Sequence, residues 1–439
     1  MGKLVSLMDI IFKGKFFDWF YHFCISKSVL TNKHVFKKQS KRLKAIMMYA
    51  TKHCDYYRKL GLKISSSDDL FKFPVLDKQL IRKLSTDSSP FVSDQIQKMV
   101  VYNGFTGGST GEPLRLILSP GIDSLFQNRV WKEIGFKKGD IILAMDGTKL
   151  SAESILKDEY LALTSKKQLP YGGYALSSLY LKDTNISLYF DKICELKPAF
   201  IRGYPSFVYR VARYILDNDL TIGFKVKGIE LTSEMAYPFQ ICVIEKAFRT
   251  KVYLQYGHTE AIAFGYTFDG TMVYRVEPLY GFLEVLDDSG KQVEIGETGE
   301  IVVTTLYNRA MPLIRYKTGD YAIYGGRDDR WVYLKTILGR TQDYIVGKDG
   351  EKVLLTALIF AQHFKALSNI KKWQLEQFEP GIVIAHIIKE DSFSYVDEKE
   401  IVTLFSENGN VETVFEYVDS IADTQRGKSK MLIQHITSI

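Results

Sequence analysis

The apolar and polar residues of this chain form blocks whose spacing changes along its length. Between residues 121 and 254, apolar residues at helical spacing alternate with short continuous apolar runs. The helical spacing predicts helices over 121–136, 151–163, 187–196, 205–218 and 235–248. The apolar runs predict strands over 140–146, 199–203, 226–232 and 251–254. This alternation of helices and strands indicates an α/β fold.

The two flanks of this region have different patterns. Apolar residues recur at three- and four-residue steps over 32–60, which predicts a helix. Strand-like segments separated by turn dipeptides dominate 262–338 and predict a β-rich subdomain. Helices are expected near 355–367 and 396–408 in the last hundred or so residues. We therefore expect a large N-terminal domain, 1–338, of α/β subdomains plus the β-rich subdomain, and a small α+β C-terminal domain, 339–439.

The positive charge of the chain is concentrated at its N-terminus. The net charge is +7, but residues 1–60 hold 13 Lys and Arg against 3 Asp and Glu, a balance of +10, so the remainder carries −3. That distribution disfavours a nucleic-acid partner. Aromatic residues crowd residues 12–23, but lysines and an aspartate interrupt them, and no signal-peptide cleavage site follows. We expect a helix docked on the body of the protein, with peripheral contact of residues 1–30 with an anionic membrane as the alternative.

Composition and cysteine spacing narrow the class further. Hydrophobic residues make up 46% and charged residues 25%, as is usual for a soluble globular protein. The four cysteines are widely separated and form no C-x-x-C pair: Cys24, Cys54, Cys194 and Cys242. This pattern predicts neither a disulfide framework nor a zinc site. A cytoplasmic location is expected, with attachment to the inner membrane surface as an addition if residues 1–30 contact lipid.

A glycine-rich loop is the first candidate site. Three glycines, two threonines and a serine lie in the segment Thr106, Gly107, Gly108, Ser109, Thr110 and Gly111, followed by Glu112 and Pro113. Glycines allow backbone N–H groups to converge on an anion, and the hydroxyls add donors. The loop lacks the Gly-Lys-Ser/Thr ending of a Walker loop and does not match the dinucleotide fingerprint. It predicts either a polyphosphate-binding loop or a solvated turn.

Four other segments combine glycine with polar or charged residues. They are Tyr256-Gly257-His258-Thr259-Glu260, Arg315-Tyr316-Lys317-Thr318-Gly319-Asp320, Gly339-Arg340-Thr341-Gln342-Asp343 and Arg426-Gly427-Lys428-Ser429-Lys430. A carboxylate at the end of a strand can hold Mg²⁺, and a tyrosine offers a face for a purine. Taken singly, each segment is more often structural than functional.

Together and in this order, the segments resemble the adenylate-forming superfamily of acyl-CoA synthetases, from about residue 40 to residue 436. Asp55-Tyr56-Tyr57-Arg58 and Phe73-Pro74-Val75, followed by Asp77-Lys78, are similar to the short phenylacetate–CoA ligase branch. That branch includes capsular polysaccharide biosynthesis relatives. The resemblance implies an AMP-forming acid ligase that uses ATP and Mg²⁺, with coenzyme A as the expected acceptor. Transfer to a carrier protein or a sugar in surface polysaccharide synthesis is the alternative.

The resemblance also implies roles for individual residues. The loop 106–111 would hold the ATP phosphates, and Ser233, Glu234, Tyr256 and Gly257 would lie against the nucleotide. Thr259 would contact phosphate, Glu260 would hold Mg²⁺, Asp320 would bind ribose and Arg340 would assist there. Lys428 would be the catalytic lysine of adenylation, carried on a mobile C-terminal lid with its hinge at Gln342 or Asp343. His258, together with Tyr256, would border the acyl pocket, or would simply bond to neighbouring backbone.

Two other classes of function remain as competing hypotheses. A phosphotransferase could use the same glycine loop, but no Walker lysine or kinase catalytic loop is present. It would release ADP in place of AMP and pyrophosphate. A basic scaffold on a membrane or nucleic acid would use only the first 60 residues. The sequence leaves the acid, the final acceptor and the oligomeric state open.

Overall fold

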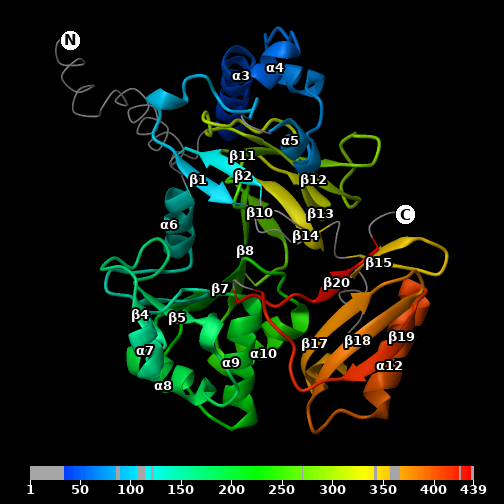
Figure 1. Cartoon of the computed structure of the whole chain (residues 1–439). Coiled ribbons are helices and arrows are strands. Elements are labelled where there is room, and N and C mark those ends of the chain that lie inside the picture. Colours follow the sequence, from blue (N-terminus) through cyan, green and yellow to red (C-terminus); the bar gives the residue numbers. More distant parts are fainter. Residues whose placement is uncertain are drawn as a thin grey trace. The chain divides into compact units, whose positions relative to one another are not determined.

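A computed structural model describes residues 34–85, 89–105, 114–119, 123–268, 270–340, 344–355, 366–424 and 427–436 (Figure 1). The Cα positions divide the chain into two compact units. The first unit combines residues 1–130 with 255–337, and the second combines 131–254 with 338–439. The second segment of the second unit begins within a residue of the predicted domain boundary at 338/339. A separately moving C-terminal domain stays a prediction.

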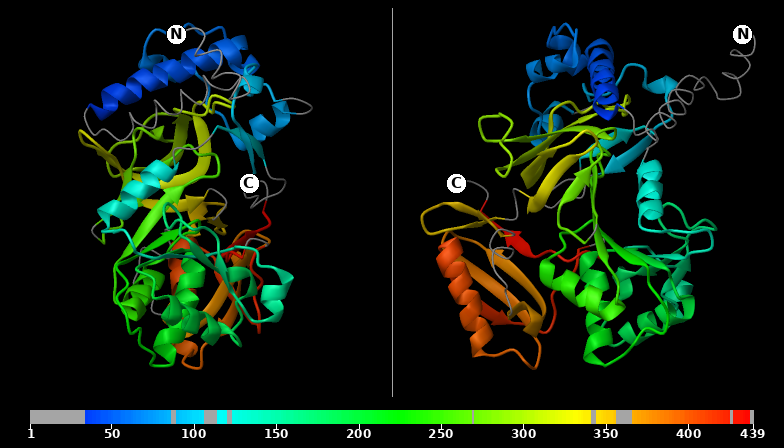
Figure 2. Two further views of the ribbon diagram at one scale, coloured as in Figure 1. Left: turned by 90° about the vertical axis from the view of Figure 1, so that its left-hand side faces the viewer. Right: turned by 180° about the vertical axis from the view of Figure 1, so that it is seen from behind.

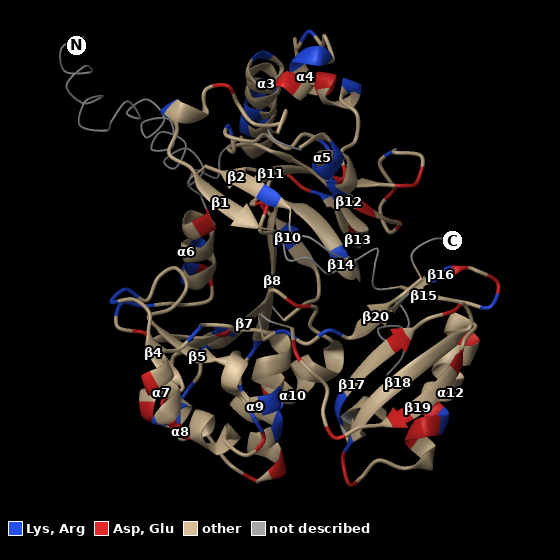
Figure 3. Ribbon diagram, viewed as in Figure 1, with Lys and Arg blue, Asp and Glu red and all other residues tan. Residues whose placement is uncertain are grey.

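The first unit begins with two helices, α3 (Val35–His53) and α4 (Asp55–Lys59). The apolar stripe that predicts a helix here is buried, with Leu43, Met47 and Ala50 at most 1% exposed. The helix breaks where Cys54 takes an extended backbone. Basic residues mark α3 and α5 (Lys78–Leu84) in Figure 3. Gln39 links α3 to the second segment of the first unit, because its side-chain amide donates to the Pro278 carbonyl at 2.7 Å.

The predicted β-rich region forms an antiparallel sheet in the first unit. Its strand order is β11-β12-β13-β14-β10-β9-β8. The strands are β8 (Val252–Gly257), β9 (Phe264–Thr267), β10 (Tyr274–Val276), β11 (Gly281–Leu286), β12 (Thr298–Thr305), β13 (Tyr316–Arg327) and β14 (Val332–Arg340). A two-stranded ribbon, β1 (Tyr102–Phe105) and β2 (Arg115–Leu118), flanks the predicted phosphate loop.

The second unit contains the predicted alternation of strands and helices. The strand order is β8-β7-β6-β3-β5-β4, in which β7, β6, β3 and β5 are parallel neighbours. The strands are β3 (Ile142–Asp146), β4 (Leu161–Leu163), β5 (Tyr174–Ser177), β6 (Phe200–Gly203) and β7 (Gly228–Thr232). The helices are α6 (Asp123–Glu133), which begins in the first unit, α7 (Ala152–Leu156), α8 (Ile186–Leu196), α9 (Pro205–Asp217) and α10 (Pro238–Phe248).

One predicted helix of this unit, 151–163, is wrong in its second half. Helix α7 ends at Leu156, and Asp158 takes a left-handed backbone with φ 55°. Residues 161–163 are extended because they pair antiparallel with β5, Leu161 opposite Leu176. Leu156 and Leu163 are exposed, so these apolar residues do not mark a buried helix face.

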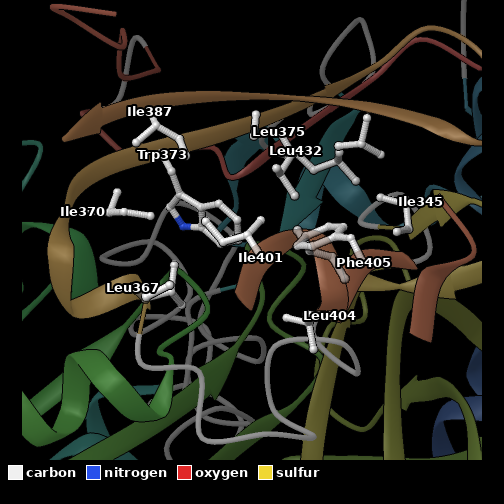
Figure 4. Packing of buried hydrophobic residues seen from close by; sticks show 14 of the residues in the cluster. Ile345, Leu367, Ile370, Trp373, Leu375, Ile387, Ile401, Leu404, Phe405 and Leu432 are labelled. Carbon is white, nitrogen blue, oxygen red and sulfur yellow. The ribbon is translucent and has the colours of Figure 1, made fainter. Parts of the chain in front are cut away.

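The C-terminal part of the second unit is a four-stranded sheet with one long helix against it. The strand order is β19-β18-β17-β20, formed by β17 (Ile370–Gln377), β18 (Ile382–Lys389), β19 (Glu412–Tyr417) and β20 (Leu432–Gln434). Helix α12 (Tyr395–Gly409) runs along one face of this sheet (Figure 2). It extends one residue beyond each end of the helix predicted near 396–408. In Figure 4 the side chains of Trp373, Ile401 and Phe405 point toward one another. Tyr237, the residue just before α10, belongs to the same core.

The predicted fold class is confirmed: α/β elements, a β-rich part and a small α+β C-terminal part are all present. The expected helix near 355–367 falls largely on residues outside the described ranges. So do residues 1–30. Within the described ranges, no helix has the length and apolar content that crossing a membrane requires.

Candidate active site

The segment Tyr256–Glu260 lies where β8 ends. Alternate residues of the strand are buried, namely Val252, Leu254 and Tyr256, as expected for a strand with one covered face. A turn follows, closed by the Ala261 N–H donating to the His258 carbonyl at 3.1 Å. Ala261 has φ 52°, in the left-handed region that non-glycine residues seldom occupy. The local backbone is therefore held in a strained turn, a feature that clusters at functional sites.

Asp320 on β13 joins two side chains of this segment. The Tyr256 hydroxyl donates to Asp320 Oδ2 at 2.9 Å, and His258 Nε2 lies 2.8 Å from the same oxygen. The rings of Tyr256 and His258 meet edge to face, with centroids 4.7 Å apart. Asp320 is 7% exposed, and its own N–H donates to Thr318 Oγ1 at 3.1 Å. Two predicted site residues, Tyr256 and His258, therefore share one oxygen of a third, the buried Asp320 carboxylate.

Glu260 is a second buried carboxylate close by in the sequence. It is 5% exposed, and its Oε1 accepts from the Tyr316 hydroxyl at 3.2 Å. Lys78 Nζ lies 3.8 Å from the same oxygen. Thr259, between His258 and Glu260, is exposed. In the described part of the chain, no three metal-ligating side chains gather in one place. A single carboxylate still suits Mg²⁺, which is often held by one or two carboxylates plus substrate phosphates.

Arg315 has a structural part in this region. Its guanidinium lies against Glu284, with Nη2 3.1 Å from Oε1, and Nη1 donates to the Phe73 carbonyl at 3.2 Å. Burial raises the pKa of Glu284, although the Arg315 charge pulls it back. Losing either partner would leave a buried charge unpaired. The pair therefore holds the start of β13, and with it the strand that carries Asp320, in the first unit.

In the second unit, Ser233 and Glu234 follow β7 at the carboxyl edge of the parallel strands. Strand β6 ends beside it at Gly203, which pairs with Leu231. Ligands of parallel α/β sheets commonly bind at this edge. Glu234 Oε2 accepts from the Ser206 N–H at 3.0 Å, in the first turn of α9. A carboxylate there is stabilised by the free N–H groups and the dipole of the helix.

The segment Gly427–Ser429 lies against this same edge. Lys428 Nζ donates to the Ser233 carbonyl at 2.9 Å and lies 5.2 Å from the centre of the Tyr204 ring. The Ser429 N–H donates to Glu234 Oε1 at 3.0 Å. Both oxygens of Glu234 therefore accept backbone N–H groups from distant segments. Burial raises the pKa of Glu234, while the Ser206 hydrogen bonds and the Lys428 charge partly offset that rise.

Comparisons with known proteins bear on the fold that carries this site. No protein-family model matches the chain. Protein CapK of Staphylococcus aureus is 24% identical over 456 residues, covering 99% of this chain and 96% of the relative. Among solved structures, 2-hydroxyisobutyryl-CoA ligase with a bound acyl-adenylate has a TM-score of 0.67 at 19% identity, covering 91% of this chain and 89% of that one. An acyl acid amido synthetase, AtGH3.15, has a TM-score of 0.56 at 16% identity, covering 90% and 88%.

The chain has the adenylate-forming ligase fold. The similarity expected from the sequence motifs is confirmed at the level of the fold, across nearly the whole chain. Protein CapK fits the capsule branch of that resemblance.

Within the adenylate-forming fold, the predicted site residues fall into three groups. The first unit brings together Tyr256, His258 and Asp320. The second unit brings together Ser233, Glu234 and Lys428. Gly257, Thr259 and Glu260 belong to the same chain segment as Tyr256 and His258. The other predicted residues lie outside the described residues or, for Arg340, have an undescribed side chain: Thr106, Gly107, Gly108, Ser109, Thr110, Gly111, Arg340, Gln342 and Asp343.

Sequence reasoning gave no site role to Tyr204 and Ser206, which contact the Lys428 segment or its partner Glu234. A signal for them was present. Gly203-Tyr204-Pro205 is a strand end followed by proline at the first position of a helix. In a parallel sheet, that junction lies at the ligand-binding edge. Lys78 entered only as a mark of the family branch, and its approach to Glu260 needed the tertiary structure.

Proposed function

We propose that this protein is an ATP-dependent ligase that activates a carboxylic acid as an acyl-adenylate and passes the acyl group to an acceptor. In the first step, an oxygen of the carboxylate attacks the α-phosphorus of ATP. The bond from that phosphorus to the bridging oxygen breaks, and pyrophosphate leaves with the electron pair. In the second step, a nucleophile of the acceptor attacks the acyl carbon and AMP leaves.

The observation that carries the proposal is the contact of the Lys428 segment with the Ser233–Glu234 edge. Lys428 and Ser233 are 195 residues apart, yet the lysine ammonium donates to the Ser233 carbonyl at 2.9 Å. A lysine there supplies a point charge that can offset negative charge building on phosphate and carboxylate oxygens. This arrangement supports adenylation by Lys428, with Ser233 and Glu234 lining the nucleotide side.

The remaining roles follow from the types of side chain. Asp320 is proposed to accept hydrogen bonds from the ribose hydroxyls, since ionised carboxylates are strong acceptors. Glu260, with Thr259 beside it, is proposed to hold Mg²⁺, which would neutralise charge on the phosphate oxygens. The loop 106–111 and Arg340 keep their proposed places at the phosphates and ribose. Residues 339–439 are proposed to act as a lid that moves between the two half-reactions.

Coenzyme A is the acceptor we propose, in keeping with the coenzyme A ligase whose fold this chain shares. A carrier protein or a sugar in surface polysaccharide synthesis is the second candidate. Similarity to Protein CapK over 99% of this chain favours it. Both acceptors share the first half-reaction, so that step is the one to test first.

The test is acid-dependent exchange of labelled pyrophosphate into ATP, screened over aryl, acyl, hydroxy and amino acids. AMP and pyrophosphate, in place of ADP, are the expected products. Glu260→Gln should abolish exchange because it removes the charge proposed to hold Mg²⁺. Glu294→Gln, at an exposed position, is the matched control and should leave it unchanged. Formation of ADP, or full exchange by a folded Glu260→Gln protein, would contradict the assignment. Thioester formation on adding coenzyme A then distinguishes the two acceptors.

A further inference from the structure

One nitrogen of the buried His258 ring is unexplained by the contacts above. The His258 side chain is 7% exposed. Its Nε2 atom faces Asp320 Oδ2 at 2.8 Å and the Tyr256 hydroxyl at 2.9 Å. Its Nδ1 atom is shielded from water, and none of the residues that the structure describes forms a hydrogen bond with it. Buried polar atoms are nearly always paired in folded proteins, so this one needs a reason.

The geometry at Nε2 determines what Nδ1 can do. A ring nitrogen 2.8 Å from a carboxylate oxygen must carry a proton, because two lone pairs at that distance would repel. The Tyr256 hydroxyl donates to the same oxygen and so helps to hold the carboxylate in place. With the proton on Nε2, a neutral imidazole presents Nδ1 as a bare acceptor. The ring is thus oriented by Asp320 with its acceptor directed elsewhere.

We infer that His258 Nδ1 binds a hydroxyl group of a ligand. The inference rests on the proposed function, because it assigns the orphan nitrogen to the ligands of that reaction. A hydroxyl suits the site in either charge state of the ring, since it can donate to a bare nitrogen or accept from a protonated one. Two sources carry such a group: a hydroxyl on the carboxylic acid, and a ribose hydroxyl of ATP. An acid without a hydroxyl leaves Nδ1 unpaired unless the ribose meets it.

This assignment makes His258 a residue that determines specificity. A site built to bind a hydroxyl rejects the analogue that lacks it, because the buried polar group is then left unpaired. The expected discrimination is roughly 5- to 150-fold, the range for one unpaired buried group. If His258 had only a structural role, replacing it would lower activity on all ligands alike.

Two variants separate the nitrogens. His258→Gln can keep an amide near the Nε2 position, toward Asp320, but has no acceptor at the Nδ1 position. His258→Asn can place its amide oxygen near Nδ1 while giving up the Asp320 contact. Circular dichroism confirms that each variant is folded before use.

The experiment measures pyrophosphate exchange in two arms. One arm compares a hydroxy acid with the matched acid lacking the hydroxyl, and the other compares ATP with 2′-deoxy-ATP and 3′-deoxy-ATP. Wild type should prefer the hydroxyl-bearing member in the arm whose hydroxyl His258 binds, and the loss of that preference in His258→Gln identifies the source, because a ribose preference due to Asp320 alone persists in this variant. His258→Gln should lose that preference, and His258→Asn should keep part of it. Equal losses on all ligands, or wild-type preferences that His258→Gln retains in both arms, would overturn the inference while leaving acid activation intact.

Failure of the proposed function has a different signature. Wild type would then show no pyrophosphate exchange with any of the acids. Calorimetric titration of the same acid and nucleotide pairs into wild type and His258→Gln still measures the hydroxyl contribution without turnover. A hydroxyl preference that His258→Gln abolishes would uphold the assignment of Nδ1. No preference in either arm would overturn it.

Discussion

Gly427, the residue before the proposed catalytic lysine, occupies a position that alanine cannot take without strain. Its φ is +69°, and a Cβ atom there would lie 2.3 Å from Ser178 Oγ and 3.0 Å from Leu179 Cδ2. The left-handed backbone costs alanine about 1–2 kcal/mol. Moving the Ser178 side chain off its rotamer adds about 1 kcal/mol. Gly427→Ala should therefore weaken docking of the Lys428 segment by about 2–3 kcal/mol.

Hydrogen exchange measures this docking directly. The Ser429 N–H is bonded to Glu234, so its exchange reports how often the segment opens. A loss of about 2–3 kcal/mol predicts exchange roughly 30- to 150-fold faster in a peptide that covers residues 427–430, because about 1.4 kcal/mol corresponds to tenfold. Exchange in α9 should be unchanged, since that helix keeps its own hydrogen bonds.

Ser178 allows the two parts of the penalty to be separated. Its Oγ is buried and has no partner among the described residues, so Ser178→Ala should by itself cost little. In the double variant with Gly427→Ala the clash is relieved, and exchange should slow again by roughly fivefold, the part due to about 1 kcal/mol. Gly223→Ala is the control, because a Cβ there meets nothing within 4 Å. Unchanged exchange in Gly427→Ala, or no partial rescue by Ser178→Ala, would refute the argument.

Three other predictions test the site and the core. Lys428→Ala should lower pyrophosphate exchange by roughly 10²- to 10³-fold, while ATP binding, measured by calorimetry, is retained. Lys430→Ala should leave both exchange and ATP binding unchanged. Loss of exchange in Lys430→Ala but not in Lys428→Ala would move the catalytic role to Lys430. Asp320→Asn should weaken ATP binding by about 1.5–3 kcal/mol, and an unchanged dissociation constant would exclude a ribose contact. Burial raises the pKa of the Cys54 thiol to about 12, so at pH 8 only about one in ten thousand is thiolate. Among the three cysteines that the structure describes, iodoacetamide should then label the exposed Cys242 first, with Cys54 reacting only on unfolding or as the pH approaches 12.

The sequence alone was sufficient for elements whose determinants are local. Helix α9 begins at Pro205, whose fixed φ suits the first helical position, and its buried stripe includes Phe207, Val211 and Ile215. Its predicted range, 205–218, differs from the observed one by a single residue. Strands β6 and β7 were also predicted from the sequence, because short apolar runs between helices indicate buried parallel strands. In each case the information lies within a few residues of the element.

Elements that depend on a distant partner were not determined locally. Residues 161–163 are extended because β5 is beside them, and nothing within the segment itself specifies that pairing. The same limit applies to the candidate site. The motifs marked Tyr256, His258 and Asp320 as separate candidates, but only the folded sheet shows that the first two share one oxygen of the third.

The contact between Lys428 and Ser233 is the clearest example of what the tertiary structure decided. The resemblance of the motifs to a known family implied a catalytic lysine near the C-terminus, and the apolar pattern predicted a strand end near residue 233. They carried no information that Ser429 would donate to Glu234, or that Ser206 would bind the other oxygen of the same carboxylate. Local preferences act over a few residues, whereas closing a separation of 195 residues depends on packing throughout the second unit. The sequence therefore determined which side chains could do the chemistry, and the packing of distant segments decided which of them meet.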